Sequence, residues 1–339
     1  MPSSMTSRER VRAALDGREV DRPPVSMWRH FFDMERSAED LAAAMLAYQK
    51  LHGWDFMKMN PRASYHAEPW GLRVRYSGDR PPDVTAVPVN DPKDWLKIEP
   101  VRLDHPIFRE QLRAIELISQ GLGSRLVFLA TVFNPISVAS RLAASEDAFM
   151  RHLREHTAQV DSAIEAITET FTAFAKAAME RGAGGLFFAT TAFASTDRMT
   201  VAEYRRYARP WDLKVLDAVQ APDFHMLHVC RDNNMLPEFR GYPVDAFNWD
   251  VRGIGNPGLA EGKAILGGRC VVGGIPQKDG MVSATPQQMR GEVVGLRSAM
   301  GKKGWMLGSG CTYAPETPEA NVKAVREAIE GPFEQSRPG

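Results

Sequence analysis

The chain has 339 residues, and its 42 basic and 42 acidic side chains give a formal net charge of zero. This balance gives no electrostatic reason to expect a nucleic acid or an anionic membrane as a partner, and no apolar run reaches the roughly 20 residues that span a bilayer. Only 3 cysteines are present, too few for a disulfide framework, which favours a cytoplasmic protein with reduced thiols.

The N-terminal segment, 1–17, lacks the apolar core of a secretory signal and predicts a capped helix that starts near Ser7. After it, short apolar runs alternate with amphipathic stretches. The runs predicted to be strands are Val25–Phe31, Asp55–Met59, Leu126–Asn134, Gly185–Thr190, Phe224–Cys230, Val244–Asp250, Ala264–Gly268 and Trp305–Cys311. The stretches predicted to be helical include 38–53, 146–181, 201–220, 285–304 and 317–331.

This alternation implies parallel strands joined by right-handed crossovers, and eight such units predict an α/β fold of the (β/α)8 TIM-barrel type. A doubly wound open sheet is the rival. The segment 253–258 formally matches a dinucleotide-binding glycine loop, but Pro257 lies in it and no strand ending in an acid follows. We therefore expect one barrel domain over 1–339, with an excursion after the second strand in the region 64–104, which is rich in Pro, Arg and Asp.

A split cluster of soft metal ligands is the most informative feature. His228 and Cys230 are two residues apart, a spacing that places both side chains on one face of a strand. Cys311 and Asp250 end other predicted strands, so all four would meet at the C-terminal rim of the barrel. Three soft ligands with Asp250 or water in the fourth position are typical of a catalytic zinc site.

Ligation by two thiolates favours activation of a thiol, and hence alkyl transfer to sulfur, over generation of hydroxide. The alternative is that Cys230 and Cys311 are small buried hydrophobes and His228 is a hydrogen-bonded core residue. Cys270, in GGRCVVGG, has no partner signal and is expected in the core.

The opening RERVRAALDGREVDRPPVSMW, the stretch HVCRDN and the closing LGSGCTYAPETPEANVKAVREAI resemble the uroporphyrinogen decarboxylase superfamily, most closely its zinc-dependent methyltransferases that work with corrinoid proteins. The resemblance covers nearly the whole chain and implies a (β/α)8 barrel with zinc on His228, Cys230 and Cys311. HVCRDN is also similar to the zinc motif of cobalamin-independent methionine synthase, whose carboxylate ligand corresponds in position to Asp250. The family often forms dimers, so a homodimer is a possibility left open.

The chain departs from the true decarboxylases at two places. Their arginine-rich segment after the first strand is MWRHFF here, in which Arg29 stands alone, and their aspartate after the second strand is missing from FMKMNPRAS, which offers Asn60. Decarboxylation of uroporphyrinogen is therefore not expected. The chain also lacks the Asp-x-His-x-x-Gly signature of corrinoid carriers, so any cobalamin would come from a separate corrinoid protein.

Other residues at predicted strand ends are candidates for the pocket. His30, as an acid or base, and Asp250, in the fourth metal position, are the candidate catalytic residues. The candidates for substrate binding are Trp28, Arg29, Asn60, Asn134 and Tyr313. Each has a structural alternative as a hydrogen-bonding, turn-forming or core residue.

The leading hypothesis is a zinc-dependent methyltransferase that moves a methyl group between a small-molecule donor, or a thiol acceptor, and a corrinoid protein. One alternative is a metal-independent, decarboxylase-like lyase that acts on a small carboxylate through Arg29 and His30. Another is a barrel that binds a tetrapyrrole or corrinoid without catalysis.

Overall fold

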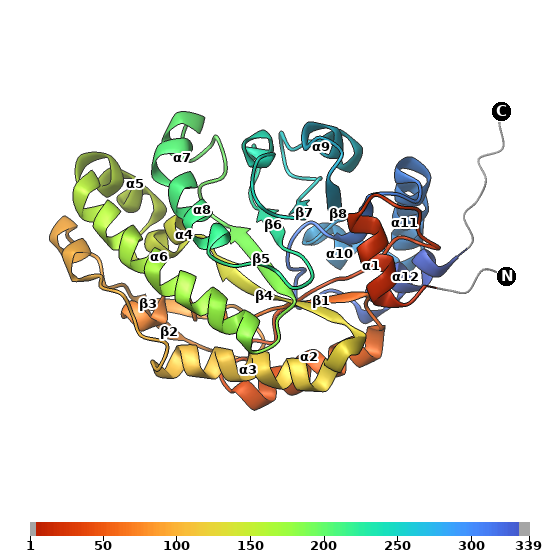
Figure 1. The fold of residues 1–339 in the computed structure, drawn as a ribbon, viewed down its shortest axis with the longest axis horizontal. Helices are drawn as coiled ribbons and strands as arrows, with labels where there is room; N and C mark the ends of the chain where they lie inside the picture. The colour runs from red at the N-terminus through yellow and green to blue at the C-terminus, as the bar shows by residue number, and fades with distance from the viewer. Residues whose placement is uncertain (1–4, 332–339) are drawn as a thin grey trace.

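A computed structural model of the protein describes residues 5–331, apart from the side chain of residue 279. Its main sheet has seven parallel strands in the order β1-β4-β5-β6-β7-β8-β9, and it curls round into a barrel (Figure 1). The strands are β1 (Phe56–Met59), β4 (Val127–Phe133), β5 (Gly185–Thr190), β6 (Met226–Val229), β7 (Ala246–Trp249), β8 (Cys270–Ile275) and β9 (Trp305–Ser309).

The gap between β9 and β1 is closed by a short extended segment. Val25 forms a parallel bridge with Leu307, flanked by hydrogen bonds from the Leu307 N–H to the Pro24 carbonyl at 2.8 Å and from the Ser26 N–H to the Leu307 carbonyl at 3.1 Å. On the other side, the Asp55 N–H donates to the Val25 carbonyl at 2.9 Å. This segment takes the place of the eighth strand, so the predicted (β/α)8 barrel is confirmed, although the strand predicted over 25–31 is reduced to one bridge.

The strand predicted at Ala264–Gly268 is wrong. These residues end helix α9 (Leu259–Ile265) and the turn after it, where Gly267 and Gly268 have φ of 71° and 82°, a conformation that favours glycine. The strand begins two residues later, at Cys270, where β-branched side chains follow. Cys270 is buried at the start of β8, as expected of a core residue.

The predicted helices are confirmed, two of them with breaks. The stretch 146–181 divides at His156 into α5 (Glu146–Glu155) and α6 (Thr157–Glu180), and 201–220 divides at Ala208, just before Pro210, into α7 (Val201–Tyr207) and α8 (Arg209–Asp217). The other helices are α1 (Ser7–Leu15), α2 (Ala38–His52), α3 (Pro106–Leu122), α4 (Pro135–Leu142), α10 (Asp279–Ser283), α11 (Pro286–Met300) and α12 (Glu319–Glu330). No helix of residues 5–331 has the length and apolar character needed to span a bilayer.

The chain between β1 and β4 contains the additional structure expected there. It forms a two-stranded antiparallel sheet of β2 (Arg73–Arg75) and β3 (Asp83–Ala86), followed by the 3-10 helix η2 (Pro92–Lys97) and then α3. Trp95 of η2 is buried and donates from Nε1 to Nδ1 of His152 at 3.1 Å. This tryptophan fastens the segment to α5 on the outside of the barrel.

The barrel interior is apolar at its N-terminal end and polar at its C-terminal end. Alternate strand residues face inward and pack together, among them Phe56, Leu129, Phe187, Met226, Ala246, Val272 and Met306, and α1 covers the N-terminal end with Val11, Ala13 and Ala14. Buried Asp55 anchors α1 through Arg10 at 2.7 Å and binds Arg22 at 2.5 Å. The larger cavity, which adjoins the predicted ligands, lies at the C-terminal rim.

Candidate metal centre

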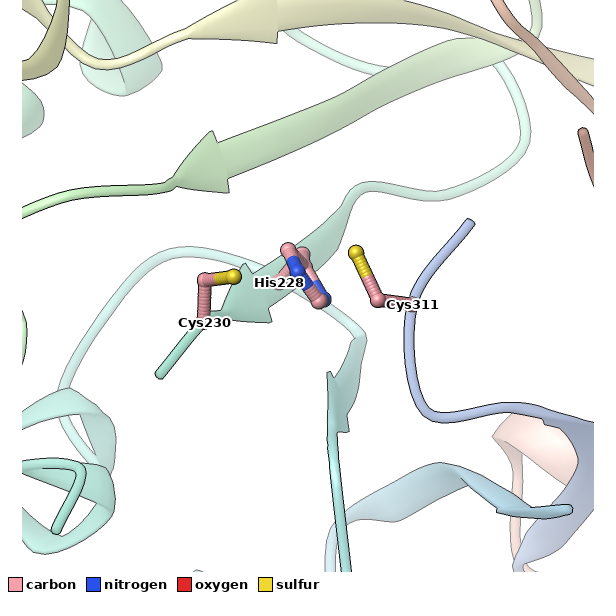
Figure 2. A group of neighbouring side chains, drawn as sticks. All are labelled: His228, Cys230 and Cys311. Carbon is pink, nitrogen blue, oxygen red and sulfur yellow. The ribbon is translucent and has the colours of Figure 1, made fainter. Parts of the chain in front are cut away.

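Three soft ligands converge at the C-terminal ends of β6 and β9. His228 lies in β6, Cys230 directly follows this strand, and Cys311 follows β9. One ligand atom from each residue lies within 4.8 Å of those of the other two, and Figure 2 shows both thiols beside the imidazole ring. The structure thus brings together the residues that the sequence singled out, because the ends of parallel barrel strands share one rim.

A hydrogen-bonded asparagine fixes the imidazole of His228. Nδ1 of His228 lies 2.6 Å from Oδ1 of Asn248, which is its register partner on β7. The Asn248 amide donates from Nδ2 to the carbonyls of Val272 at 2.8 Å and Ser309 at 3.0 Å, so its oxygen must face the ring. His228 therefore carries its proton on Nδ1, and Nε2 is left as a lone-pair donor, the arrangement seen at metal-binding histidines.

The geometry fits a zinc ion. Nε2 of His228 is buried without a hydrogen-bond partner among residues 5–331, an arrangement that is costly unless a ligand occupies the site. Ligands about 2.0–2.3 Å from a tetrahedral zinc lie roughly 3.5–3.8 Å apart, so the observed spread of up to 4.8 Å needs only small side-chain adjustments. One imidazole and two thiols form a donor set suited to zinc, with a position left open.

The pKa values of the two thiols are shifted in opposite directions. The hydrogen bond with Cys230, together with the nearby His228, lowers the pKa of Cys311, whereas the hydrogen bond with Cys311 and burial raise the pKa of Cys230. The pair thus tends to share one proton, which a metal ion would displace on binding.

Asp250 lies beside this centre, but its carboxylate is already engaged. Oδ1 accepts from the Arg252 N–H at 2.9 Å, and Oδ2 accepts from Nε2 of Gln277 at 2.6 Å. Its Cα is so close to Gly310 that a Cβ there would meet it at 2.8 Å, which explains the glycine before Cys311. To become a fourth ligand, Asp250 would have to give up one of these bonds.

An open cavity of about 990 Å³ adjoins the centre. Cys230, Cys311 and Asp250 line it together with residues from the loops after β5 to β8 and from α11, among them Thr191, Arg231, Ile254, Gln277, Met289 and Glu292. Its wall is mixed, with charged side chains beside exposed apolar ones. A ligand much larger than a simple thiol therefore has room next to the two sulfurs.

The side chains of Trp28, Arg29 and Asn60 contact other parts of the fold and do not line this cavity. Trp28 is buried inside the barrel, edge-on to Phe187 with ring centroids 5.5 Å apart. Arg29 forms an ion pair with Asp79, and Asn60 donates to the Thr312 hydroxyl at 3.4 Å. Their assignment to substrate binding stays a prediction.

Asn134 and Tyr313, also predicted to bind substrate, lie in buried hydrogen-bonded pairs outside the cavity wall. Asn134 donates from Nδ2 to the Asp212 carboxyl at 3.0 Å, and the Tyr313 hydroxyl lies 2.7 Å from that of Tyr48. Being at the end of a strand did not bring either side chain to the centre.

His30 is held by a buried carboxylate. Its Nδ1 lies 2.9 Å from Oε2 of Glu35, whose Oε1 accepts from the Ala63 N–H at 2.7 Å, and its ring stacks on Phe32. No hydrogen bond to Nε2 of His30 is found in the described part of the chain. A carboxylate that orients an imidazole and leaves its second nitrogen available is compatible with the predicted acid–base role.

Sequence reasoning missed two residues close to the centre, Asn248 and Lys58. Each is the polar residue of a short, fully buried strand, AFNW for β7 and FMKM for β1. A lone amide or ammonium in such a strand is unusual, because it needs a buried partner. That signal was available in the sequence, but only the register shows that Asn248 lies opposite His228.

Comparisons with known proteins identify the family and the fold. The family model described as uroporphyrinogen decarboxylase (URO-D) matches residues 6–331. The chain is similar to the methylcobamide:CoM methyltransferase MtaA of Methanosarcina barkeri, with 25% identity over 340 residues that cover 95% of this chain and 97% of the relative. It is also similar to the methylcobamide:CoM methyltransferase MtbA of Methanosarcina mazei, with 23% identity over 95% of this chain and 97% of the relative.

Two solved structures share the fold. A methyltransferase from Methanosarcina mazei superposes with a TM-score of 0.78 at 23% identity, covering 96% of this chain and 98% of the other. A B12-independent methionine synthase from Shewanella sp. W3-18-1 superposes with a TM-score of 0.59 at 10% identity, covering 91% and 92%.

Proposed function

The chain belongs to the uroporphyrinogen decarboxylase family, and on this premise we propose that it is a zinc-dependent methyltransferase that moves a methyl group between a small molecule and a corrinoid protein. Its similarity over nearly full length to methylcobamide:CoM methyltransferases supports corrinoid-linked methyl transfer. The observation that carries the zinc is the buried, unpartnered Nε2 of His228 next to two thiols.

In this proposal His228, Cys230 and Cys311 hold the metal, with water or Asp250 completing its shell. When bound, zinc supplies a Lewis acid that keeps a substrate thiol deprotonated or draws electron density from a methoxy- or methylamine-type donor. Asn248 keeps the lone pair of His228 aimed at the centre, and the apolar barrel interior excludes water from beneath it. The open cavity admits the small molecule and the corrinoid of the partner protein.

His30 is proposed as an acid–base group on the opposite side of the rim. Glu35 fixes its Nδ1, so Nε2 can accept or return a proton. The lyase alternative has less support, since it needs Arg29 for a substrate carboxylate. That guanidinium is already engaged by Asp79 and by the His30 carbonyl.

Metal analysis combined with methyl-transfer assays tests the proposal. Freshly purified full-length protein should contain about one equivalent of zinc and should transfer methyl groups between free methylcobalamin and members of a thiol panel. Cys311→Ser should lose most of the metal and at least about a hundredfold in rate, because the Lewis acid is lost.

Cys270→Ser is the matched control, because Cys270 is buried at the other end of its strand, away from the centre. It should keep both metal and activity. Zinc far below one equivalent in the wild type, with C311S as active as the wild type, would refute the proposal.

A further inference from the structure

A buried lysine lies inside the barrel on the centre's side. Lys58 is the third residue of β1; Phe56, two residues before it, faces the interior, whereas Met57 and Met59 pack on the outer core. Lys58 is therefore directed inward, and it is only 4% exposed. Its ammonium group therefore lies inside the barrel.

An aromatic ring lies between this ammonium and the ligands. Nζ of Lys58 lies 4.8 Å from the ring centroid of Phe187. The same ring stacks on the imidazole of His228, with centroids 5.4 Å apart and planes 22° from parallel. Lys58 and the candidate metal ligands are thus neighbours across one side chain.

Lys58 also acts electrostatically on the ligand from β9. Burial lowers the pKa of Lys58 to about 7, and Cys311, followed by Glu35, opposes that shift. In return Lys58 is one of the groups, after Cys230 and His228, that lower the pKa of Cys311. The geometry carries the proximity independently: the ammonium of Lys58 contacts the ring of Phe187, and that ring stacks on His228.

Within residues 5–331 no carboxylate forms an ion pair with Lys58, and no hydrogen bond from Nζ is found. Glu35, the acid that acts on it, is instead bound to His30 and to the Ala63 N–H. An unpaired ammonium is costly to bury, and the cation–π contact offsets only part of that cost. A negative charge at the nearby metal centre would offset the remaining cost of burying the ammonium.

The charge of the centre depends on what is bound there. A zinc ion with two thiolates and a neutral imidazole is neutral, so an anionic sulfur from the substrate would bring its charge to minus one. We propose that Lys58 is the counter-charge for this state, a positioning residue that favours a negatively charged sulfur ligand at the centre. This inference rests on the proposed function and identifies a further residue of the same site.

The counter-charge acts on the substrate, not on the metal. Loading the two sulfurs with zinc never makes the centre more negative, because the metal's charge balances or exceeds the charge of the protons that it displaces, so loss of Lys58 should not weaken metal binding. Binding of an anionic sulfur adds a negative charge near the ammonium. At an effective dielectric constant of about 20, loss of that attraction weakens binding by about tenfold or more.

The experiment loads the full-length protein with Co²⁺ and follows its thiolate absorption. It measures three dissociation constants for wild type, Lys58→Met and Lys58→Arg. The ligands are Co²⁺, 2-mercaptoethanol, a thiol without a second charge, and mercaptoacetate, a thiol with a carboxylate. Met has similar length without charge, and Arg keeps the charge. Lys263→Met is the control: Lys263 is partly buried, lies on α9 and donates to the Lys303 carbonyl, away from the centre.

The expected result is that K58M binds Co²⁺ at least as tightly as wild type but binds 2-mercaptoethanol about tenfold more weakly. K58R should recover most of this loss, and K263M should match wild type for each ligand. Circular dichroism and thermal melting check that each variant is folded.

Each other outcome overturns a distinct claim. If the wild type binds no Co²⁺, the proposed function itself fails. If wild type and K58M bind Co²⁺ and the thiol equally, the proposed function stands and the counter-charge is refuted. If K58M binds mercaptoacetate more weakly but 2-mercaptoethanol normally, Lys58 binds an acidic group of the substrate. If K58M loses affinity for Co²⁺ to the same extent as for the thiol, Lys58 supports the fold of the site. Either result refutes the role of Lys58 as a counter-charge.

Discussion

The two halves of the barrel rim are both formed by strand ends, but the polar side chains on them have different surroundings. On the half formed by β6 to β9, His228 keeps an unpartnered nitrogen beside an open cavity. On the half formed by β1 and β4, the amide donors of Asn60 and Asn134 are engaged within the fold. Their carboxamide oxygens are buried without a partner among the residues that the structure describes, but neither side chain lines the cavity. Position at a strand end therefore makes a residue a candidate, and an unpartnered atom becomes available to a ligand where an open cavity adjoins it.

The largest expected effect on this comparison comes from Asn248→Ala. This change removes the acceptor that fixes Nδ1 of His228, and loss of such a partner weakens metal binding by about 10- to 100-fold. Competition titration with a chelator measures it. Asn60→Ala, the corresponding amide on the other half, should leave metal affinity within about twofold; equal losses in the two variants would erase the distinction between the halves.

The β4 side of the barrel also carries a titrating group whose protonation is coupled to stability. Burial raises the pKa of Asp212 from 3.8 to about 7, opposed by hydrogen bonds from Tyr204, Asn134 and Tyr242. The folded state thus holds a proton that the unfolded state releases. Stability from this group is complete below pH 3.8 and is lost as the pH rises towards 7.

From roughly pH 5 to pH 7, this group alone should lower the free energy of unfolding by about 2 kcal/mol. In Asp212→Asn that contribution should vanish, and the slope should flatten. Urea unfolding at several pH values measures the slope, with the exposed Asp104→Asn as control. An unchanged slope in D212N would show that Asp212 is ionised throughout.

His30 is the residue that tests the comparison, because it lies on the half formed by β1 and β4 and yet its second ring nitrogen has no hydrogen bond within the described residues and its side chain is partly exposed. His30→Asn should lower the methyl-transfer rate by about tenfold, less than a full acid–base contribution because water can also exchange the proton. Zinc content should stay unchanged. A normal rate with a lower melting temperature would assign His30 to structure alone and strengthen the contrast between the halves.

The smallest expected effect concerns the cavity mouth. Ile254 is 74% exposed on the cavity wall, and a large apolar ligand such as a corrinoid would cover part of it. Ile254→Ser should therefore raise the KM for methylcobalamin by about threefold with kcat unchanged. Leu96→Ser is the matched control, since Leu96 is 63% exposed on η2 and not on the cavity wall. An equal KM in both variants would show that the corrinoid does not bind against Ile254.

The sequence by itself predicted the barrel and singled out the three soft side chains that the structure brings together. The alternation of strand and helix patterns is local and repeats along the chain. The predicted fold therefore stays the same even though one strand was misplaced at 264–268. The two-residue spacing of His228 and Cys230 needs only a strand to put both on one face. That Cys311 joins them follows from the rule that parallel barrel strands end at one rim.

Only the tertiary structure decided which polar residues around that rim are free and which are engaged. Asn248 orients His228 because the register of β6 and β7 places them opposite each other, and Lys58 reaches the centre's side of the barrel through Phe187. Contacts of this kind join residues far apart in the chain, and no local period encodes them. The sequence therefore identified the candidate donors, whereas packing across the barrel set their orientation, their charge environment and the side that faces the open cavity.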